Sequence, residues 1–246
     1  MVDGDRWQAA QEYERGYWER AAQRISEGAA SQLDWYRWRA DRLAARLSRL
    51  GMGELAQGGA AVVEVGSGPV GLAGFFPAAK RVLIDPLNEF YGRNPVLTKL
   101  RNPEAVYLAG PGESLPIDDG AFDLAIIENC IDHVRDCDAV MRELRRALKP
   151  DGVLYLTVNC RSRLGYPVHR VLSRLRLDRG HPHTFVPRKL ERLLRAHRFD
   201  VQEVDPESYW TSFWADLWSP RGRDRLKALL GISEYIASAV AIRRDA

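Results

Sequence analysis

An apolar run passes directly into a glycine-rich turn in Val62-Val63-Glu64-Val65-Gly66-Ser67-Gly68-Pro69-Val70-Gly71. The uniformly apolar, β-branched run predicts a strand that is buried on both faces of a parallel sheet. Gly66 and Gly68 allow a tight turn and a close approach of the backbone to a ligand, and an open α/β sheet binds its ligand at such a turn. The Gly-x-Gly-x-x-Gly spacing is also typical of dinucleotide-binding proteins. Glu64, two residues before the first glycine, begins to separate these interpretations.

Strand and helix patterns alternate after residue 60, which predicts parallel strands joined by right-handed crossovers. The expected strands are 61–65, 81–84, 105–108, 122–127, 153–158, 200–204 and 235–242. Helical spacing covers 134–148, where a proline-containing turn ends it, and also 190–196. Because no repeat or linker divides the chain, residues 1–246 are expected to form a single domain with a Rossmann-like core at 60–246.

The first 52 residues are expected to be helical and to form an N-terminal cap on this core. Apolar residues with three- and four-residue spacing form one stripe in the second half, namely Leu33, Tyr36, Ala40, Leu43, Ala44, Leu47 and Leu50. The first half carries the aromatic residues Trp7, Tyr13, Tyr17 and Trp18. Two interpretations remain open: plain packing against the domain, or closure over a ligand with exclusion of water.

The composition is that of a soluble globular protein, with 46% hydrophobic and 28% charged residues among 246. A net charge of +3 is small for a protein that binds nucleic acid. The sequence shows no apolar run near the roughly 20 residues of a membrane helix and no signal-peptide core. Its three cysteines form no Cys-x-x-Cys pair, as is usual for buried thiols in a reducing compartment. We therefore expect a cytoplasmic protein without a membrane span.

Five ordered motifs resemble the class I S-adenosylmethionine-dependent methyltransferases, and most of all their type 11 branch. These motifs are Glu64-Val65-Gly66-Ser67-Gly68, Ile84-Asp85, Glu113-Ser114-Leu115-Pro116, Phe122-Asp123-Leu124-Ala125-Ile126 and Leu148-Lys149-Pro150-Asp151-Gly152. The resemblance covers about residues 60–205. It implies a seven-stranded mixed sheet with one antiparallel strand, helices on both faces, and S-adenosylmethionine as the cofactor.

By this resemblance the cofactor is bound by Glu64, Gly66, Ser67, Gly68, Asp85, Pro86, Gly112, Glu113, Glu128 and Asn129. Glu64 would hold the amino group of the cofactor. Asp85, an acid at a strand end, can accept hydrogen bonds from both ribose hydroxyls, although a turn aspartate before proline is the plainer alternative. Gly112-Glu113 would contact adenine, and Glu128-Asn129 would border the methionine portion. Pro111 stands where the family often has an acid, so adenine recognition departs from the family pattern.

Methyl transfer from a sulfonium needs alignment, a dry site and a means of removing a proton from a hydroxyl acceptor. The candidate catalytic residues are Asp132, His133, His181 and His183. Helix capping is the alternative for the first pair, and packing is the alternative for the second. Two histidines without a nearby carboxylate or cysteine make a poor metal site, so no metal is expected.

Two further segments, 160–185 and 206–222, are expected as insertions on the acceptor side. The first carries the arginines Arg161, Arg163, Arg170, Arg174, Arg176 and Arg179 against the single acid Asp178, with an apolar side of Leu164, Val168, Val171, Leu172 and Leu175. It is either a solvated basic helix or a site for an anionic group. The second carries Tyr209, Trp210, Phe213, Trp214 and Trp218, which either wall an acceptor or cover the sheet edge.

The sequence thus predicts O-methylation of a small molecule that resembles a sugar or a natural product, with an anionic or aromatic acceptor. Two alternatives remain: a nucleic-acid methyltransferase that uses the basic 160–180 segment, and a protein that binds S-adenosylmethionine without transferring the methyl group. A nicotinamide dehydrogenase would fit the glycine spacing alone, but the later motifs argue against it.

Overall fold

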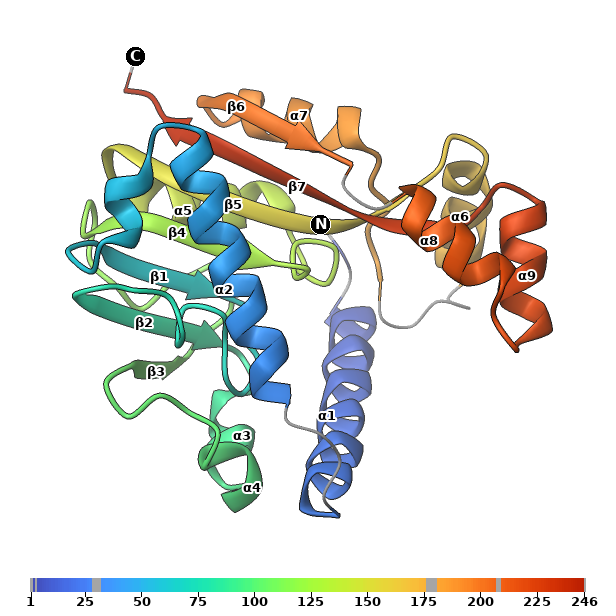
Figure 1. Ribbon diagram of the computed structural model, residues 1–246, viewed down its shortest axis with the longest axis horizontal. Helices are drawn as coiled ribbons and strands as arrows, with labels where there is room; N and C mark the ends of the chain where they lie inside the picture. The colour runs from blue at the N-terminus through green and yellow to red at the C-terminus, as the bar shows by residue number, and fades with distance from the viewer. Residues whose placement is uncertain (1, 3, 28–31, 176–180, 207–208, 246) are drawn as a thin grey trace.

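The computed structural model describes residues 2, 4–27, 32–175, 181–206 and 209–245 (Figure 1). Seven strands form one sheet in the order β3-β2-β1-β4-β5-β7-β6. They are β1 (Ala61–Val65), β2 (Lys80–Asp85), β3 (Val106–Ala109), β4 (Phe122–Glu128), β5 (Leu148–Arg161), β6 (Phe199–Asp205) and β7 (Glu234–Arg243). Strands β1 to β5 pair in parallel, whereas β7 runs antiparallel to both β5 and β6. The expected mixed α/β sheet with one antiparallel strand is confirmed.

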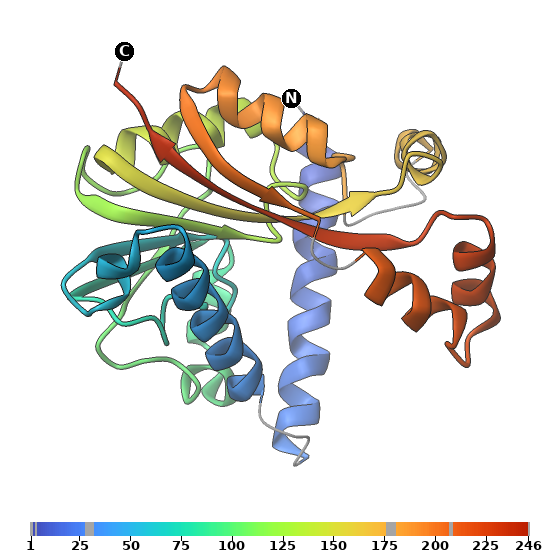
Figure 2. The same ribbon diagram turned by 45° about the horizontal axis from the view of Figure 1, so that its top comes forward.

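Helices cover both faces of this sheet (Figures 1 and 2). Alternate residues of the strands point to opposite faces. Val62 and Ile126 therefore pack with α2 (Gln32–Arg49). Their neighbours in the strands pack with α5 (Cys137–Ala147) and α7 (Pro187–Ala196) on the other face. The shorter elements are η1 (Gly53–Ala56), α3 (Asn88–Gly92) and α4 (Pro95–Thr98).

The N-terminal segment is two helices rather than one continuous run. α1 (Gly4–Ser26) lies beyond the carboxyl ends of the parallel strands, whereas α2 lies on a face of the sheet (Figures 1 and 2). The apolar stripe of α2 is buried as expected at Tyr36, Ala40, Leu43 and Leu47. The side chain of Leu33 lies outside the described residues.

Among the element boundaries that differ from the sequence expectation, two differ for clear reasons. β5 runs to Arg161 instead of residue 158, because β7 offers backbone partners along the register from Val153 to Arg161. α5 begins at Cys137 rather than at residue 134, because the Asp136 carboxylate caps it and accepts hydrogen bonds from the amides of Asp138 and Ala139. Residues 132 and 133 therefore belong to the turn before the helix and do not cap it.

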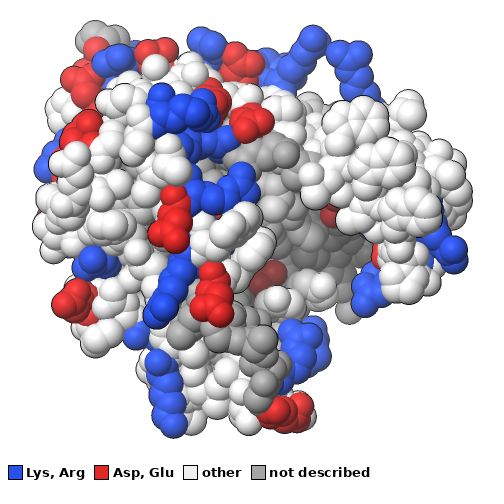
Figure 3. Space-filling view, viewed as in Figure 1, with Lys and Arg blue, Asp and Glu red and all other residues white. Residues whose placement is uncertain are grey.

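Three helices, which we call the lateral helices, lie at the far end of the long β5–β7 pair (Figure 1). They are α6 (Gly165–Arg174), α8 (Tyr209–Leu217) and α9 (Gly222–Leu229). The apolar side expected at 164–175 faces solvent, since Leu164, Val168, Val171, Leu172 and Leu175 are all exposed. Trp210, Trp214 and Trp218 are exposed as well, and the surface around α8 in Figure 3 is largely uncharged. Arg176, Asp178 and Arg179 lie outside the described residues.

Within the described part of the chain, no helix combines the length and the apolar character needed to cross a bilayer.

The attachment of α2 to the sheet can be tested with two matched leucine truncations. Leu43→Ala removes a side chain that is 1% exposed, and we expect it to lower the free energy of unfolding by about 2–5 kcal/mol. Leu226→Ala in α9 removes one that is 56% exposed, and its effect should stay within about 0.5 kcal/mol. Urea unfolding measures both. Equal losses from the two variants would contradict the placement of α2.

Candidate functional site

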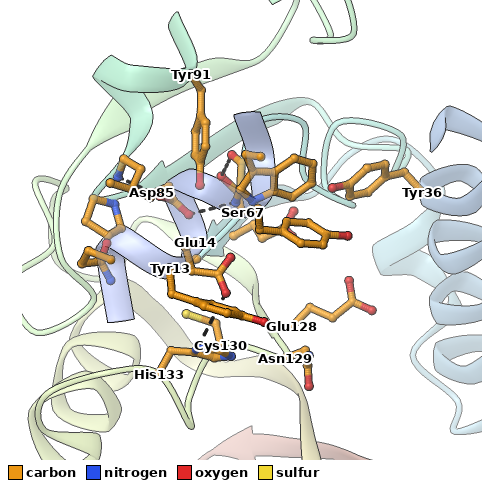
Figure 4. Close-up of a pocket in the computed structure, with 18 of the residues that line it drawn as sticks. Tyr13, Glu14, Tyr36, Ser67, Asp85, Tyr91, Glu128, Asn129, Cys130 and His133 are labelled. Atoms are coloured by element: carbon orange, nitrogen blue, oxygen red, sulfur yellow. Dashed lines mark hydrogen bonds and ion pairs between the residues drawn. The ribbon is translucent and has the colours of Figure 1, made fainter. Parts of the chain in front are cut away.

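A cavity of about 540 Å³ opens at the carboxyl edge of the sheet. Its floor comes from the residues that end β1, β2 and β4, and its other walls from α1 and α2. Figure 4 shows Tyr13 and Glu14 of α1 pointing toward Cys130 and His133, which follow β4. The turn after a parallel strand, the expected ligand position, thus lies under a helical cover.

Glu64, the penultimate residue of β1, lines this cavity and is 2% exposed. Its Oε2 accepts a hydrogen bond of 2.7 Å from the amide of Ala73. Burial, followed by the negative charge of Glu128, raises the pKa of Glu64 to about 8, although the amides of Ala73 and Leu72 oppose the shift. The charged form of this carboxyl group is therefore unfavourable in the empty cavity, and a cation that enters would stabilise it.

The glycine turn is held close to the segment that follows β4. Gly66 has φ +72°, and a Cβ at this position would lie 2.1 Å from Sγ of Cys130. The turn therefore requires glycine both for its backbone conformation and for space. Gly68 faces Trp18 of α1 in the same way, with 3.3 Å between a built Cβ and the indole ring.

Asp85 ends β2 and lines the cavity together with Pro86. Its Oδ2 accepts from the amide of Gly68 at 2.9 Å, and its Oδ1 accepts from the amide of Leu87 at 2.8 Å. Burial raises the pKa of Asp85 to about 6 against these two hydrogen bonds. Each oxygen keeps a second lone pair, so the carboxylate still has capacity for a hydroxyl ligand.

Glu128 and Asn129 border the cavity at the end of β4, where the sequence places them. Arg39 of α2 donates from Nε to Oε1 of Glu128 and forms an ion pair with it. This pair ties the helical cover to the sheet edge. Asn129 has φ +50° and its amide donates to Thr157, which turns the chain toward residue 130.

The two remaining expected cofactor residues lie elsewhere. Neither Gly112 nor Glu113 is among the residues that line the cavity. Oε1 of Glu113 instead accepts hydrogen bonds from the amides of Arg135 and Asp136, and it thereby holds the turn before α5. An acid in a loop next to a helix start has this structural use, which a motif comparison does not reveal.

The site residues expected from the sequence include none on the helical cover, yet eight cover residues line the cavity. They are Gln11, Tyr13, Glu14, Tyr17, Trp18, Trp35, Tyr36 and Arg39. The cluster of aromatic residues at 7–18 was the available signal. It suggested a cap, but it could not show which side chains turn inward.

Asp132, His133 and His181 come together at one side of the cavity. Each of the three residues offers one possible ligand atom, a ring nitrogen or a carboxylate oxygen. These three atoms lie within 4.8 Å of one another. The imidazole rings of His133 and His181 lie 4.6 Å apart between centroids. His133 and His181 line the cavity, while Asp132 is 1% exposed behind them.

His183 lies outside this group. Its Nε2 lies 2.8 Å from the carbonyl oxygen of Val134, an acceptor, so this nitrogen carries the proton and donates. Burial lowers the pKa of His183. A ring fixed in this way holds the 181–185 loop against the turn after β4 and is not positioned as a base.

A second cavity of about 190 Å³ adjoins the 181–185 loop. It is lined by Arg6, Arg170, Arg174 and Lys189 together with polar side chains. Nη2 of Arg6 donates to Oγ of Ser173 at 2.6 Å. Of the expected basic segment, Arg161 is not part of this cavity, because it is buried and paired with Glu234.

Comparison with known proteins shows what part of the chain is similar to. Residues 63–156 match the sequence model of the family described as a methyltransferase domain, type 11. An uncharacterized methyltransferase of Mycobacterium sp. (strain KMS) is 31% identical over 150 residues, which cover 56% of this chain and 56% of that protein. The chain therefore spans little more than half the length of this curated relative.

Solved structures share the fold at low identity. Phosphoethanolamine N-methyltransferase 2 of Haemonchus contortus, in complex with S-adenosylmethionine, matches with a TM-score of 0.60 and 16% identity, over 83% of this chain and 53% of that one. Geranyl diphosphate methyltransferase, in complex with geranyl diphosphate and sinefungin, matches with a TM-score of 0.59 and 17% identity. The match covers 82% of this chain and 77% of that one.

The raised pKa of Glu64 predicts a pH-dependent stability for the ligand-free protein. The folded carboxyl has a pKa of about 8 against an ordinary value of 4.5, so the folded state binds more protons between these two pH values. The contribution of Glu64 to the free energy of unfolding is therefore fully present below about pH 4.5. It is lost as the pH rises toward 8, by at most ~1.4 kcal/mol per pH unit.

Urea unfolding at pH 5, 6, 7 and 8 measures this dependence. Glu64→Gln removes the titrating group, so its stability should fall less between pH 6 and 8 than that of the wild type. Glu54→Gln, a change at an exposed residue, should keep the wild-type slope. Identical slopes for Glu64→Gln and the wild type would exclude Glu64 as the source.

Proposed function

We propose that the chain is a class I methyltransferase of the type 11 family, which transfers a methyl group from S-adenosylmethionine to a small-molecule acceptor. One observation carries this proposal. Glu64, the turn of Gly66 and Gly68, and Asp85 all line one covered cavity at the carboxyl edge of the sheet.

These residues fit the cofactor chemically. The cofactor carries an ammonium and a sulfonium, and Glu64 and Glu128 supply carboxyl groups at the cavity floor. Asp85 would take the ribose hydroxyls with its remaining lone pairs. The Gly112-Glu113 loop would contact adenine through its backbone, because the carboxylate of Glu113 is engaged by the turn before α5. Leu87, whose amide donates to Asp85, and Tyr91 also line the cavity and offer apolar surface there.

The residues around the methyl group would align the acceptor and exclude water. Methyl transfer is an in-line displacement in which the acceptor oxygen attacks, the carbon–sulfur bond breaks and the sulfur leaves as a neutral thioether. Alignment of this kind can supply roughly 7–11 kcal/mol of the barrier. Tyr13, Tyr17 and Trp18 of α1 cover the cavity, so we assign to the N-terminal helices the role of a cap.

Oxygen is the proposed methylated atom, because a hydroxyl acceptor must lose its proton and the Asp132–His133–His181 group can assist that loss. We propose an acceptor of the sugar or natural-product kind that also carries an anionic group. The second cavity, with Arg170, Arg174 and Lys189 beside the 181–185 loop, supports the anionic group. Phosphoethanolamine and geranyl diphosphate, which appear in the names of two structural neighbours, are anionic too.

Calorimetric titration with S-adenosylmethionine tests the proposal first. We expect saturable binding of this cofactor and of S-adenosylhomocysteine, and no binding of a nicotinamide dinucleotide. Asp85→Asn should weaken the binding by about 1.5–3 kcal/mol, the scale of a charge-assisted hydrogen bond. The exposed Asp118→Asn variant should bind as the wild type does. Unchanged affinity in Asp85→Asn would overturn the ribose assignment, and dinucleotide binding would overturn the function.

Turnover tests the role of the histidine group. His133→Ala should lower the rate of S-adenosylhomocysteine release by roughly 10²–10⁴-fold, measured with the most active member of a panel of hydroxylated, phosphorylated small molecules. Cofactor affinity should remain nearly intact, because Glu64 and Asp85 hold the cofactor. A loss of affinity equal to the loss of turnover would contradict this division of roles.

A further inference from the structure

A buried carboxylate oxygen stands without a hydrogen-bond partner beside the cavity. Oδ1 of Asp132 has none within the described part of the chain, although the residue is only 1% exposed. Its near neighbour is Nε2 of His133 at 3.8 Å, which is too long for a hydrogen bond. Burying an unpaired carboxylate is unfavourable, so a cation is expected at this oxygen.

The two imidazoles beside it complete a set of metal ligands. Donor atoms of Asp132, His133 and His181 lie within 4.8 Å of one another. In a tetrahedral shell with bonds of 2.0–2.1 Å, ligand atoms are about 3.3 Å apart. Contraction of the group by roughly 1.5 Å at most, through rotation of the two rings, would bring all three atoms to one ion.

The fold itself assembles the group from distant parts of the sequence. The amide of His183 donates to the carbonyl of Asp132 at 3.3 Å, and its ring donates to the carbonyl of Val134 at 2.8 Å. The amide of Arg161 donates to the carbonyl of Phe185 at 2.9 Å, which fixes the other end of the loop to β5. These contacts of the residues that follow His181 in the loop place it beside His133.

We propose that Asp132, His133 and His181 bind one divalent transition-metal ion. Two histidines and one carboxylate form the ligand set of catalytic zinc and of non-haem iron sites, which leave coordination positions open. Ligating histidines usually donate their second ring nitrogen to a carboxylate. Oε1 of Glu14 lies 3.9 Å from Nδ1 of His133, on the side away from Asp132, and is placed for that role.

The chemical use of the ion rests on the proposed function. His133 and His181 line the cofactor cavity, so an ion that they hold would lie at the wall of that cavity. A hydroxyl of the acceptor that binds the ion has a lowered pKa and releases its proton to water. The resulting alkoxide attacks the methyl carbon and the thioether leaves. Binding of the ion itself does not depend on methyl transfer, so the two can fail separately.

Calorimetric titration of the chelator-treated protein with Zn²⁺ tests the site. We expect one ion per chain. The affinity should fall roughly 100-fold or more in each of three variants, Asp132→Asn, His133→Gln and His181→Gln. This loss exceeds the range that is typical when only a residue hydrogen-bonded to a metal ligand is removed. His197→Gln is the matched control, because His197 pairs with Asp138 outside the cavity. It should bind as the wild type does. Far-UV circular dichroism shows whether each variant folds, and the isosteric Asp132→Asn keeps the side-chain volume.

Cobalt absorption supplies a readout that is independent of affinity. Co²⁺ bound by two histidines and a carboxylate shows weak d–d bands without the thiolate charge-transfer band that Cys130 would produce. Failure of folded wild-type protein to bind Zn²⁺, affinity unchanged in the three folded variants, or a thiolate band would each overturn the metal site. Cofactor binding without metal binding would overturn the site alone and leave the proposed function in place.

Discussion

Three carboxyl groups, those of Glu64, Asp85 and Asp132, are held almost entirely out of water around one cavity. Burial of a negative charge is tolerated only where hydrogen bonds or cations compensate for the lost hydration. Backbone amides compensate in part for Glu64 and Asp85, and their pKa values still rise. The site is therefore prepared for positive charge. The proposed cofactor, with its ammonium and sulfonium, would satisfy this requirement at one end, and the proposed metal ion would satisfy it at the other.

The parallel part of the fold could be predicted from the sequence because its causes are local. A β-branched run between glycines is enough to identify β1, and the acid that ends β2 lies at the same sheet edge by topology alone. Glu64, Asp85, Glu128 and Asn129 line the cavity for this reason. Strand ends were less predictable, since the extra length of β5 depends on a partner strand near the end of the chain.

The rest of the site depends on contacts between segments that are far apart in the sequence. The two histidines at 181 and 183 seemed to lack a carboxylate, because the sequence does not show that the loop is held against Asp132. The spacing of 181 and 183 suggested that they act together, yet one ring faces the cavity and the other holds a carbonyl. Similarly, Glu113 satisfies a motif but serves the turn before α5. In each case hydrogen bonds between distant segments decide whether a polar side chain is free to bind a ligand or is used to hold the fold.

The antiparallel strand β7 has a consequence for the order of events during biosynthesis. β7 lies between β5 and β6 in the sheet but follows both of them in the chain. While residues 234–243 are still inside the ribosome, β5 has an open edge and β6 has no neighbour to pair with, whereas β1 to β4 can already associate. The nascent chain therefore exposes an unpaired strand edge for longer than a purely sequential sheet would, and such an edge invites intermolecular pairing. Completion of the sheet by its last strand is then a late and non-local step, and chaperone demand should be concentrated there.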